Sequence, residues 1–422
     1  MNSAVNATAS GAGAGPVDGP IRVEFVIEGP SLFWLSLRMA LLTVLTLGFY
    51  RFWMSTNLRR YYWNAVQVMG DPFEYTGKGL EKLLGFLLAL VILAVYLTFV
   101  NLILAFLGLA NFDDPVALQI MINLSFLASL PLIYFATYRA WRYIMSRTRW
   151  RGIRFGMDQA AWAYTWRAMG LTLLTIVTLG FLYPYQHFKL TKFMVDRTWF
   201  GTLRFQQGGA WTELLGYWAW IFAIIAVVAV LFGIGAATGD EAILTVAAII
   251  FSFGYLAIFI LFIRYGVASF RYLWKHRTLG QARFHNDVDT GEIIGITIGG
   301  SMGAGMCAFF IAFFVTAILA LIVLGSIVGA DFEAFERMID GGDPSAAWPF
   351  VFVMVFGYLL LFVLAFAFTQ IFLTRPILRR KVAGMQIAEA ASLAASQQRA
   401  HDQALEAGGF ADALGVDIGA GL

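Results

Sequence analysis

The sequence predicts an all-α polytopic membrane protein with six transmembrane helices. Apolar residues make up 60% of its 422 residues and charged residues 13%, against roughly 45–50% and about 25% in soluble domains. Long apolar runs reach the roughly 20 residues with which a helix crosses the hydrocarbon core. The same order of segments also returns along the chain, which predicts internal repeats.

Six apolar segments form three pairs, and each pair predicts a membrane hairpin with an acidic connecting loop. The first loop carries Asp113 and Asp114, the second Asp240 and Glu241, and the third five acidic residues between 331 and 343. The segments are Leu80–Leu109, Pro115–Met145, Trp211–Ala237, Ala242–Trp274, Glu292–Ala330 and Ala346–Leu373.

The other connections are basic, and this asymmetry predicts the orientation. Basic residues gather, for example, between Arg139 and Arg154 and between Arg375 and Lys381. Short loops rich in Lys and Arg stay on the cytoplasmic side of a membrane. We therefore expect the acidic loops outside and both termini in the cytoplasm.

Two shorter apolar stretches, Leu32–Gly48 and Ala161–Gly180, begin and end on the basic side. Each carries an arginine, Arg38 or Arg167, and each runs into the sequence Thr-Leu-Gly-Phe before an aromatic and basic segment. We expect two re-entrant or interfacial helix–turn–helix elements with glycine at the turn. A seven-span arrangement, in which only the first stretch crosses, also satisfies the charges, but the repeat favours six spans.

Short β-strands are expected between the helical elements. The pattern Arg-Thr-x-x-Gly-x-x-Arg-Phe predicts tight hairpins with glycine at the turn. Because open strand edges cannot face lipid, we expect these strands to form a small cytoplasmic β-layer. The strand segments are Ile21–Glu28, Gly70–Tyr75, Gly152–Phe155, Gly201–Phe205 and Gly280–Phe284.

The repeats predict five regions along the chain. Residues 1–20 are Ala/Gly-rich and are expected to be a disordered tail. Residues 21–145 form repeat 1, with a strand, interfacial helices and a membrane hairpin. Residues 146–276 form repeat 2 and residues 277–381 a divergent repeat 3. Residues 382–422 are expected to form a soluble C-terminal helix and a flexible tail.

Part of this pattern resembles a known family. The segments are Phe25 with Gly29, the run Thr46 to Trp53, the Arg59-Arg60-Tyr61 triplet and Gly70 to Gly77. They are similar to the signature of the YjgN family of bacterial inner-membrane proteins, a domain of unknown function. The resemblance is clearest over residues 25–85 and looser over 171–216 and 277–284. It implies a bacterial inner-membrane location and a multi-span fold, and it brings no activity.

Three glutamates each lie in the first turn of a predicted membrane helix: Glu81, Glu213 and Glu292. A carboxylate at this position stabilises the free N–H groups and the positive end of a helix. The functional alternative is that the three carboxylates surround the cytoplasmic mouth of a cation or proton pathway, because ionisable groups in membranes usually face an interior.

Basic and aromatic residues form a second set of candidate sites. Arg38, Arg167 and Arg264 lie within apolar segments. Arg38 and Arg167 extend to the lipid headgroups if their helices are interfacial. Otherwise the arginines pair with the glutamates or bind an anionic lipid or a substrate headgroup. The aromatic and basic segments predict contact with anionic lipids at the cytoplasmic face. The residues expected to contact lipid at the interface are Trp53, Arg59, Arg60, Tyr61, Tyr185 and Lys189.

A glycine series opens the fifth membrane segment. Gly295, Gly299 and Gly303 recur every four residues, a spacing that allows two helices to approach closely. Glycines in transport helices also permit bending, so this helix is a candidate for packing or for movement.

No catalytic or metal-binding pattern accompanies these features. The four histidines are scattered, the one cysteine lies in an apolar run, and the net charge of +3 gives no indication of nucleic acid binding. We therefore expect no catalytic residues, no metal and no cofactor, and an intramembrane enzyme is the least favoured class. The sequence favours a transporter or channel-like protein for a small solute, ion or lipid. The alternative is a membrane scaffold or lipid-interacting assembly protein. Substrate, direction, coupling ion, protein partners and oligomeric state stay open.

Overall fold

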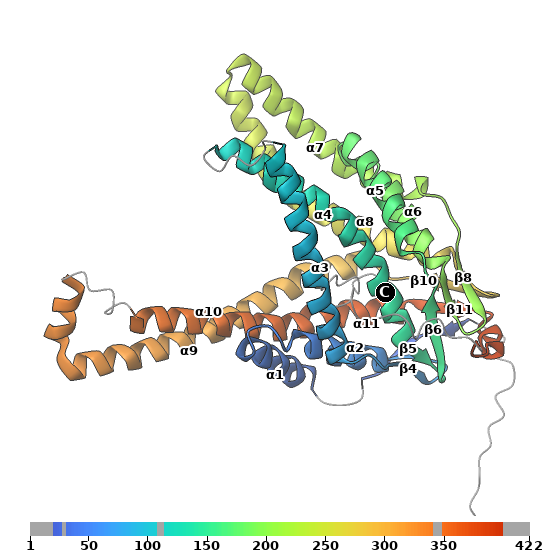
Figure 1. Ribbon diagram of the computed structural model, residues 1–422, viewed down its shortest axis with the longest axis horizontal. Coiled ribbons are helices and arrows are strands. Elements are labelled where there is room, and N and C mark those ends of the chain that lie inside the picture. The colour runs from blue at the N-terminus through green and yellow to red at the C-terminus, as the bar shows by residue number, and fades with distance from the viewer. Residues whose placement is uncertain (1–19, 28–30, 108–113, 341–347, 400–422) are drawn as a thin grey trace, which may run out of the picture.

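The computed structural model describes residues 20–27, 31–107, 114–340 and 348–399. Most of the expected N-terminal tail, part of the first and third acidic loops, and the end of the expected C-terminal tail lie outside these ranges. Figure 1 shows the strands gathered at one end of the molecule and the long helices extending away from them.

Within these ranges, eleven short strands form one antiparallel sheet in the order β1-β11-β10-β9-β8-β7-β6-β5-β4-β3-β2. The strands are β1 (Ile21–Arg22), β2 (Glu24–Phe25), β3 (Val66–Val68), β4 (Asp71–Tyr75), β5 (Thr148–Trp150), β6 (Ile153–Met157), β7 (Thr198–Phe200), β8 (Leu203–Gln207), β9 (Arg277–Leu279), β10 (Ala282–Asn286) and β11 (Met385–Ala388).

The two edges of this sheet belong to one N-terminal segment, so the sheet curls into a nearly closed barrel. Strand β1 pairs with β11 and β2 pairs with β3, and only Val23 separates β1 from β2. The main-chain nitrogen of Val23 donates to the oxygen of Met385 at 3.0 Å, and that of Val26 donates to Ala65 at 2.8 Å. The prediction of an all-α fold is therefore wrong. Strands of two to five residues, separated by helices, are too short for their alternation to reveal a barrel.

Two-residue turns join the strands of four hairpins, as the glycine pattern predicted. The turns are Met69-Gly70, Arg151-Gly152, Gly201-Thr202 and Gly280-Gln281. Each contains at least one glycine with positive φ, and such turns match the twist of the paired strands.

Aromatic rings fill the barrel. Phe73, Phe155, Phe205 and Phe284 come from β4, β6, β8 and β10, and their ring centroids follow one another at 6.0, 6.4 and 6.2 Å. These are the phenylalanines of the repeated strand motif. Successive side chains on a strand point to opposite faces, so the preceding residues point away from this core. The interior is packed, as in other small barrels.

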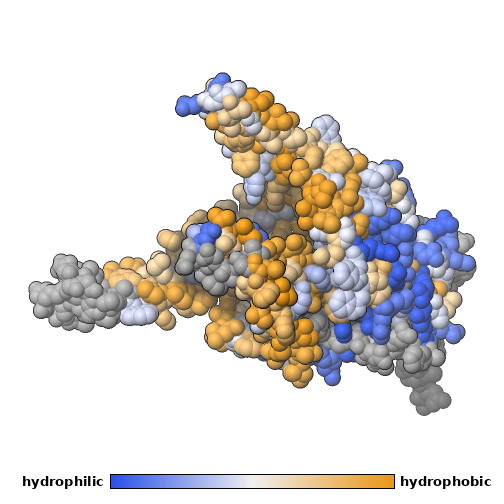
Figure 2. Space-filling view, turned by 45° about the horizontal axis from the view of Figure 1, so that its top comes forward, coloured by the Kyte–Doolittle hydropathy of each residue, from blue (hydrophilic) through white to orange (hydrophobic). Residues whose placement is uncertain are grey.

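Among the residues that the structure describes, six helices are long and apolar enough to cross a membrane, which confirms that part of the prediction. Strongly apolar residues cover the helices and hydrophilic residues gather over the strands (Figure 2). A π-helix, η2 (Gln370–Thr374), and α11 (Arg375–Ala383) continue the sixth helix toward β11. The long helices are α3 (Gly79–Phe106), α4 (Pro115–Arg147), α7 (Thr212–Thr238), α8 (Glu241–Lys275), α9 (Thr290–Asp340) and α10 (Trp348–Thr369).

Two shorter helical hairpins alternate with the long ones: α1 (Leu32–Leu45) with α2 (Arg51–Ala65), and α5 (Ala161–Val177) with α6 (Tyr183–Val195). At a rise of about 1.5 Å per residue, α1 is about 21 Å long, short of the roughly 30 Å hydrocarbon core. The predicted turn glycines are confirmed, because Gly48 and Gly180 adopt φ of 93° and 90°. Whether the hairpins re-enter the membrane or lie along it stays a prediction.

The C-terminal region differs from the expected helix. Residues 385–388 form β11, which completes the barrel, and Ala390–Ala395 form a 3-10 helix, η3. Ala390 and Leu393 belong to the same buried cluster as the barrel core. The described C-terminal segment therefore closes the barrel.

Candidate functional site

The predicted glutamates lie where the long helices leave the barrel, and Glu81 is held by two side chains. Its Oε2 lies 3.0 Å from Nη2 of Arg147 and accepts a hydrogen bond of 2.9 Å from the hydroxyl of Tyr143. Both partners belong to α4, so these contacts tie the start of α3 to the end of its hairpin partner.

The other two glutamates have separate surroundings. Glu292 pairs with Arg380 at 3.3 Å, and its main-chain nitrogen donates to Asp289 at 2.9 Å, as in a helix cap. Glu213 is exposed in the first turn of α7. Within the described ranges, no hydrogen bond or ion pair joins one of the three glutamates to another. The hypothesis of a shared carboxylate pathway stays a prediction.

The three arginines of the apolar segments are exposed. The guanidinium of Arg167 lies 4.8 Å from the ring centroid of Phe193, and that of Arg264 lies 5.9 Å from Tyr217. Arg38 lies on the exposed side of α1. These positions leave the cations accessible at the surface of the helices.

The glycine series of α9 does not provide the close contact at its predicted positions. A Cβ added at Gly295, Gly299 or Gly303 would meet nothing within 4 Å. A Cβ at the neighbouring Gly300 would instead collide with the main-chain oxygen of Phe372. Gly300 therefore allows α9 to approach the π-helix η2, a distortion that is frequent at functional sites.

The expected interfacial residues make contacts within the protein as well as facing outward. Arg60 donates to the main-chain oxygens of Tyr75 at 3.3 Å and Gly77 at 2.7 Å, so it holds the end of β4. Other cation–ring contacts connect Arg59 with Tyr75 at 5.3 Å and Lys189 with Tyr185 at 5.5 Å. Aromatic contacts also join Trp53 to Tyr50 at 6.0 Å and Tyr61 to Tyr62 at 5.5 Å.

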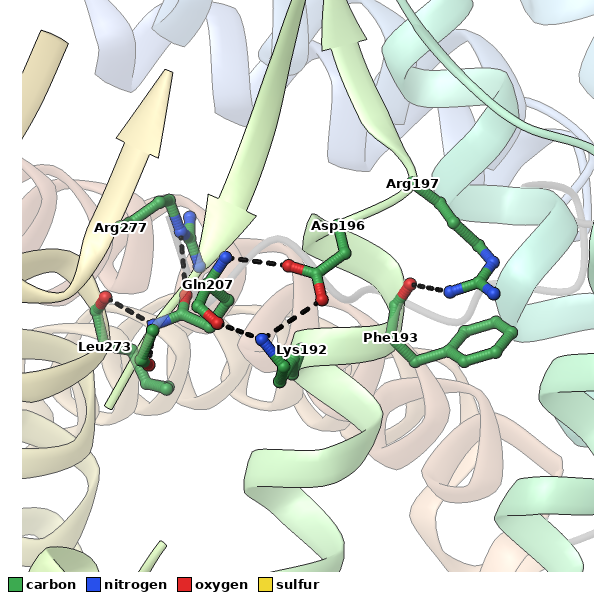
Figure 3. A network of polar contacts seen from close by, with 8 residues as sticks. Lys192, Phe193, Asp196, Arg197, Gln207, Leu273 and Arg277 are labelled. Atoms are coloured by element: carbon green, nitrogen blue, oxygen red, sulfur yellow. Dashed lines mark hydrogen bonds and ion pairs between the residues drawn. The ribbon is translucent and has the colours of Figure 1, made fainter. Parts of the chain in front are cut away.

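Sequence reasoning missed a polar network that joins α6, β8 and α8 (Figure 3). Gln207 is buried; its main-chain nitrogen donates to Asp196 at 2.7 Å, and its amide donates to Leu273 O at 2.9 Å. Lys192 donates to the main-chain oxygen of Gln207 and pairs with Asp196 at 3.2 Å. The spacing in the sequence could have indicated this contact. Lys192 donates to the main-chain oxygen of a residue 15 positions later, Gln207, and Arg60 donates in the same way to Tyr75, also 15 positions later.

Arg277 completes this network. Its Nε donates to Gln207 Oε1 at 3.2 Å, and its guanidinium lies 4.2 Å from the ring centroid of Trp274. Burial lowers the pKa of Arg277 to about 10, because desolvation disfavours the charged form. At neutral pH the side chain stays protonated, which indicates a structural cation that fixes β9 to β8.

A cavity of about 270 Å³ lies between α1, α2 and α10, away from the three glutamates. Its lining is apolar apart from Thr43 and Arg51. A second cavity, of about 180 Å³, lies between α7 and α8 and has an entirely apolar lining. In the part of the chain that the structure describes, no three His, Cys, Asp or Glu side chains are placed to hold a metal ion.

The fold therefore defines a polytopic membrane protein with a small β-barrel at the base of its helices. The chain belongs to a bacterial family described as "Bacterial protein of unknown function (DUF898)", whose model matches residues 20–306. This range includes the stretches that resemble the YjgN family and ends within α9. No curated protein and no solved structure matches the chain. Together, the six apolar helices and the family indicate a bacterial membrane protein.

Proposed function

We propose that this protein is a lipid-interacting scaffold of the bacterial inner membrane, in which a cytoplasmic barrel holds three membrane hairpins apart. The observation that carries the proposal is the exposure of the long helices along their middle. In α3, for example, the only buried residues are Gly79, Lys82 and Ala89, whereas Phe99 and Leu102 are more than 60% exposed. Helices that enclosed a pathway would bury more of their length against one another.

Figure 1 supports the same proposal, because the hairpin of α9 and α10 extends from the barrel in a different direction from the hairpins that contain α3 and α7. Apolar helix surfaces of this kind are stable in contact with lipid tails. The two described cavities are lined by neither Glu81, Glu213 nor Glu292. Transport of a small solute, ion or lipid therefore stays a prediction without a geometric argument in its favour.

The proposed orientation places the barrel and both described chain ends in the cytoplasm. Ile21 pairs with Ile387 across β1 and β11, which supports an arrangement with both described ends on one side of the membrane, as an even number of spans requires. The basic residues near the barrel, such as Arg147 and Arg380, favour the cytoplasmic side. We also propose that the two short hairpins and their following strands arose by duplication, which the equal spacing of Arg60–Tyr75 and Lys192–Gln207 supports.

A flux measurement in reconstituted vesicles tests the scaffold against transport. Purified protein is placed in vesicles with and without anionic lipid, and proton and potassium leakage is followed by fluorescence. We expect leakage equal to that of protein-free vesicles, and thermal unfolding shifted upward by anionic lipid. Flux that is present in the wild type and lost in Glu81→Gln, Glu213→Gln or Glu292→Gln would overturn the scaffold and support a carboxylate pathway.

A further inference from the structure

The first short hairpin (α1 and α2) and the second short hairpin (α5 and α6) differ in the space between their two helices and the long helix on which they pack. Polar side chains fill this space in the second hairpin, whereas a cavity occupies it in the first. In the second hairpin, the hydroxyls of Tyr134 and Thr172 lie 2.6 Å apart. Gln186 donates to Thr172 at 2.7 Å and Thr175 donates to Gln186 at 2.8 Å. Four polar side chains thus fill the space between α5, α6 and α4.

The first hairpin packs on α10, as the second hairpin packs on α4, but it lacks this polar network. Ala40, Thr43 and Met54 occupy the positions of Thr172, Thr175 and Gln186, counted from the shared Thr-Leu-Gly-Phe turn. Thr43 donates to the main-chain oxygen of Met39 at 2.8 Å within its own helix, and its one side-chain contact across the hairpin is with the sulfur of Met54, at 3.6 Å. The opposite wall is apolar, because α10 contributes Phe362 and Phe366. The cavity of about 270 Å³ is the space that remains.

Arg51 supplies the one charge at this cavity. The equivalent residue of the second hairpin is Tyr183, whose ring lies 4.7 Å from that of Trp218 and packs within the protein. Arg51 is exposed, and among the described residues no ion pair or hydrogen bond engages its guanidinium. A cation beside an apolar cavity is complementary to a molecule with an anionic head and an apolar chain.

The surroundings indicate where such a molecule comes from. The turn that precedes Arg51 exposes Leu47 at 91% and Phe49 at 56%. An exposed apolar tip next to an apolar membrane helix is typical of a surface in contact with lipid. A lipid chain therefore reaches the cavity sideways from the bilayer, without leaving the apolar phase.

We propose that the cavity between α1, α2 and α10 binds one anionic phospholipid of the inner leaflet. Its phosphate pairs with Arg51, and one acyl chain packs against Phe362 and Phe366. The inference rests on the proposed lipid-interacting function and adds to it a specific site, present in the first hairpin and closed in the second by Thr172 and Gln186.

Native mass spectrometry of the detergent-purified protein tests this site. Phosphatidylglycerol and phosphatidylethanolamine are added in equal amounts, and the retained lipid is counted. We expect the wild type to prefer phosphatidylglycerol. In Arg51→Gln the ratio of retained phosphatidylglycerol to phosphatidylethanolamine is expected to fall about fivefold, the effect of one basic residue on an anionic lipid. The matched control Arg283→Gln, which removes an exposed charge on the barrel, is expected to keep the preference.

A second pair of variants tests the chain-binding part of the cavity. Ala40→Phe fills the space and is expected to reduce retention of both lipids, whereas Ala163→Phe, on the exposed side of α5, is expected to retain them. Ala40→Leu repeats the test with a smaller side chain in case the larger one prevents folding. Inorganic phosphate added in excess is expected to leave the lipid bound; displacement by phosphate alone would identify a simple anion site and overturn the proposal.

Equal lipid preference in the wild type and Arg51→Gln would also overturn the site. That result is distinguishable from failure of the scaffold function, because the vesicle flux measurement reports on the scaffold independently. Absence of flux together with unchanged lipid preference would remove the Arg51 site and leave the scaffold proposal standing.

Discussion

Ser396 donates a hydrogen bond of 3.0 Å from its hydroxyl to the main-chain oxygen of Phe200, a residue 196 positions earlier in the chain. The side chain of Gln398 accepts from the main-chain nitrogen of Arg154 at 2.9 Å. The guanidinium of Arg399 lies 4.5 Å from the ring centroid of Trp199. The C-terminal segment thus covers the end of the barrel that carries the hairpin turns, opposite the membrane helices.

The contact between this segment and the turn of β7 and β8 predicts the effect of Gly201→Ala. A Cβ at Gly201 would collide with the hydroxyl of Ser396 and lie 2.5 Å from the oxygen of Gln397. We expect residues 390–399 to detach and to become sensitive to limited proteolysis. Gly152→Ala is the matched control, because Gly152 also has positive φ but has open space around it.

Both substitutions carry the backbone cost of a left-handed conformation, about 1–2 kcal/mol. Only Gly201→Ala adds the collision. Equal protease sensitivity of the two variants would show that the C-terminal segment is held by other contacts.

The close approach of α9 to η2 predicts opposite effects for two neighbouring glycines. Gly300→Ala forces Phe372 away and is expected to destabilise the protein by about 1–3 kcal/mol, as overpacking does. Gly299→Ala meets open space and is expected to stabilise α9 by about 0.5–1 kcal/mol, because alanine favours the helix. Thermal unfolding in detergent measures both; a larger loss in Gly299→Ala would contradict this packing.

The orientation predicts which positions react with an impermeant thiol reagent. After Cys307→Ala removes the one native cysteine, Asp240→Cys places a thiol at the start of α8, in the turn after α7. We expect labelling from outside at this position and none at Tyr50→Cys or Tyr183→Cys, which lie in the short hairpins. Outside labelling at position 183 would rule out the non-crossing arrangement, and labelling after membrane lysis confirms that each thiol is reactive.

His187 predicts a loss of stability in acid. Burial lowers the pKa of His187 below its ordinary value of 6.5, and its Nδ1 lies 3.3 Å from the hydroxyl of Tyr265. The unfolded state therefore binds the proton more readily, so the free energy of unfolding falls as the pH falls through about 6.5. We expect a smaller loss between pH 7.5 and 5.5 in His187→Gln.

The control for this pH effect is His285→Gln, because His285 is about half exposed on the barrel. This variant is expected to keep the acid loss of the wild type. If His187→Gln and the wild type lose the same stability, another group is responsible.

The sequence predicted the features that depend on neighbouring residues. The apolar length of segments such as Thr212–Thr238 identified the membrane helices, because crossing the hydrocarbon core requires a fixed length. The turn glycines Gly48 and Gly180 were also identified, since a left-handed conformation favours glycine locally. The positions of the glutamates at the helix starts were also predicted, because they depend only on the local sequence. The side chains that pair with these glutamates were not predicted.

Only the tertiary structure decided how the distant segments meet. Ile21 pairs with Ile387, and each two-residue strand gains its hydrogen bonds only when its partner is in place, β11 for β1 and β3 for β2. The nearly closed barrel, the Gln207 network and the cavity beside Arg51 all join elements that are far apart in the chain. Local patterns determined the membrane location and the turns, whereas the barrel and its sites depend on contacts whose free energy is gained only when the whole sheet closes.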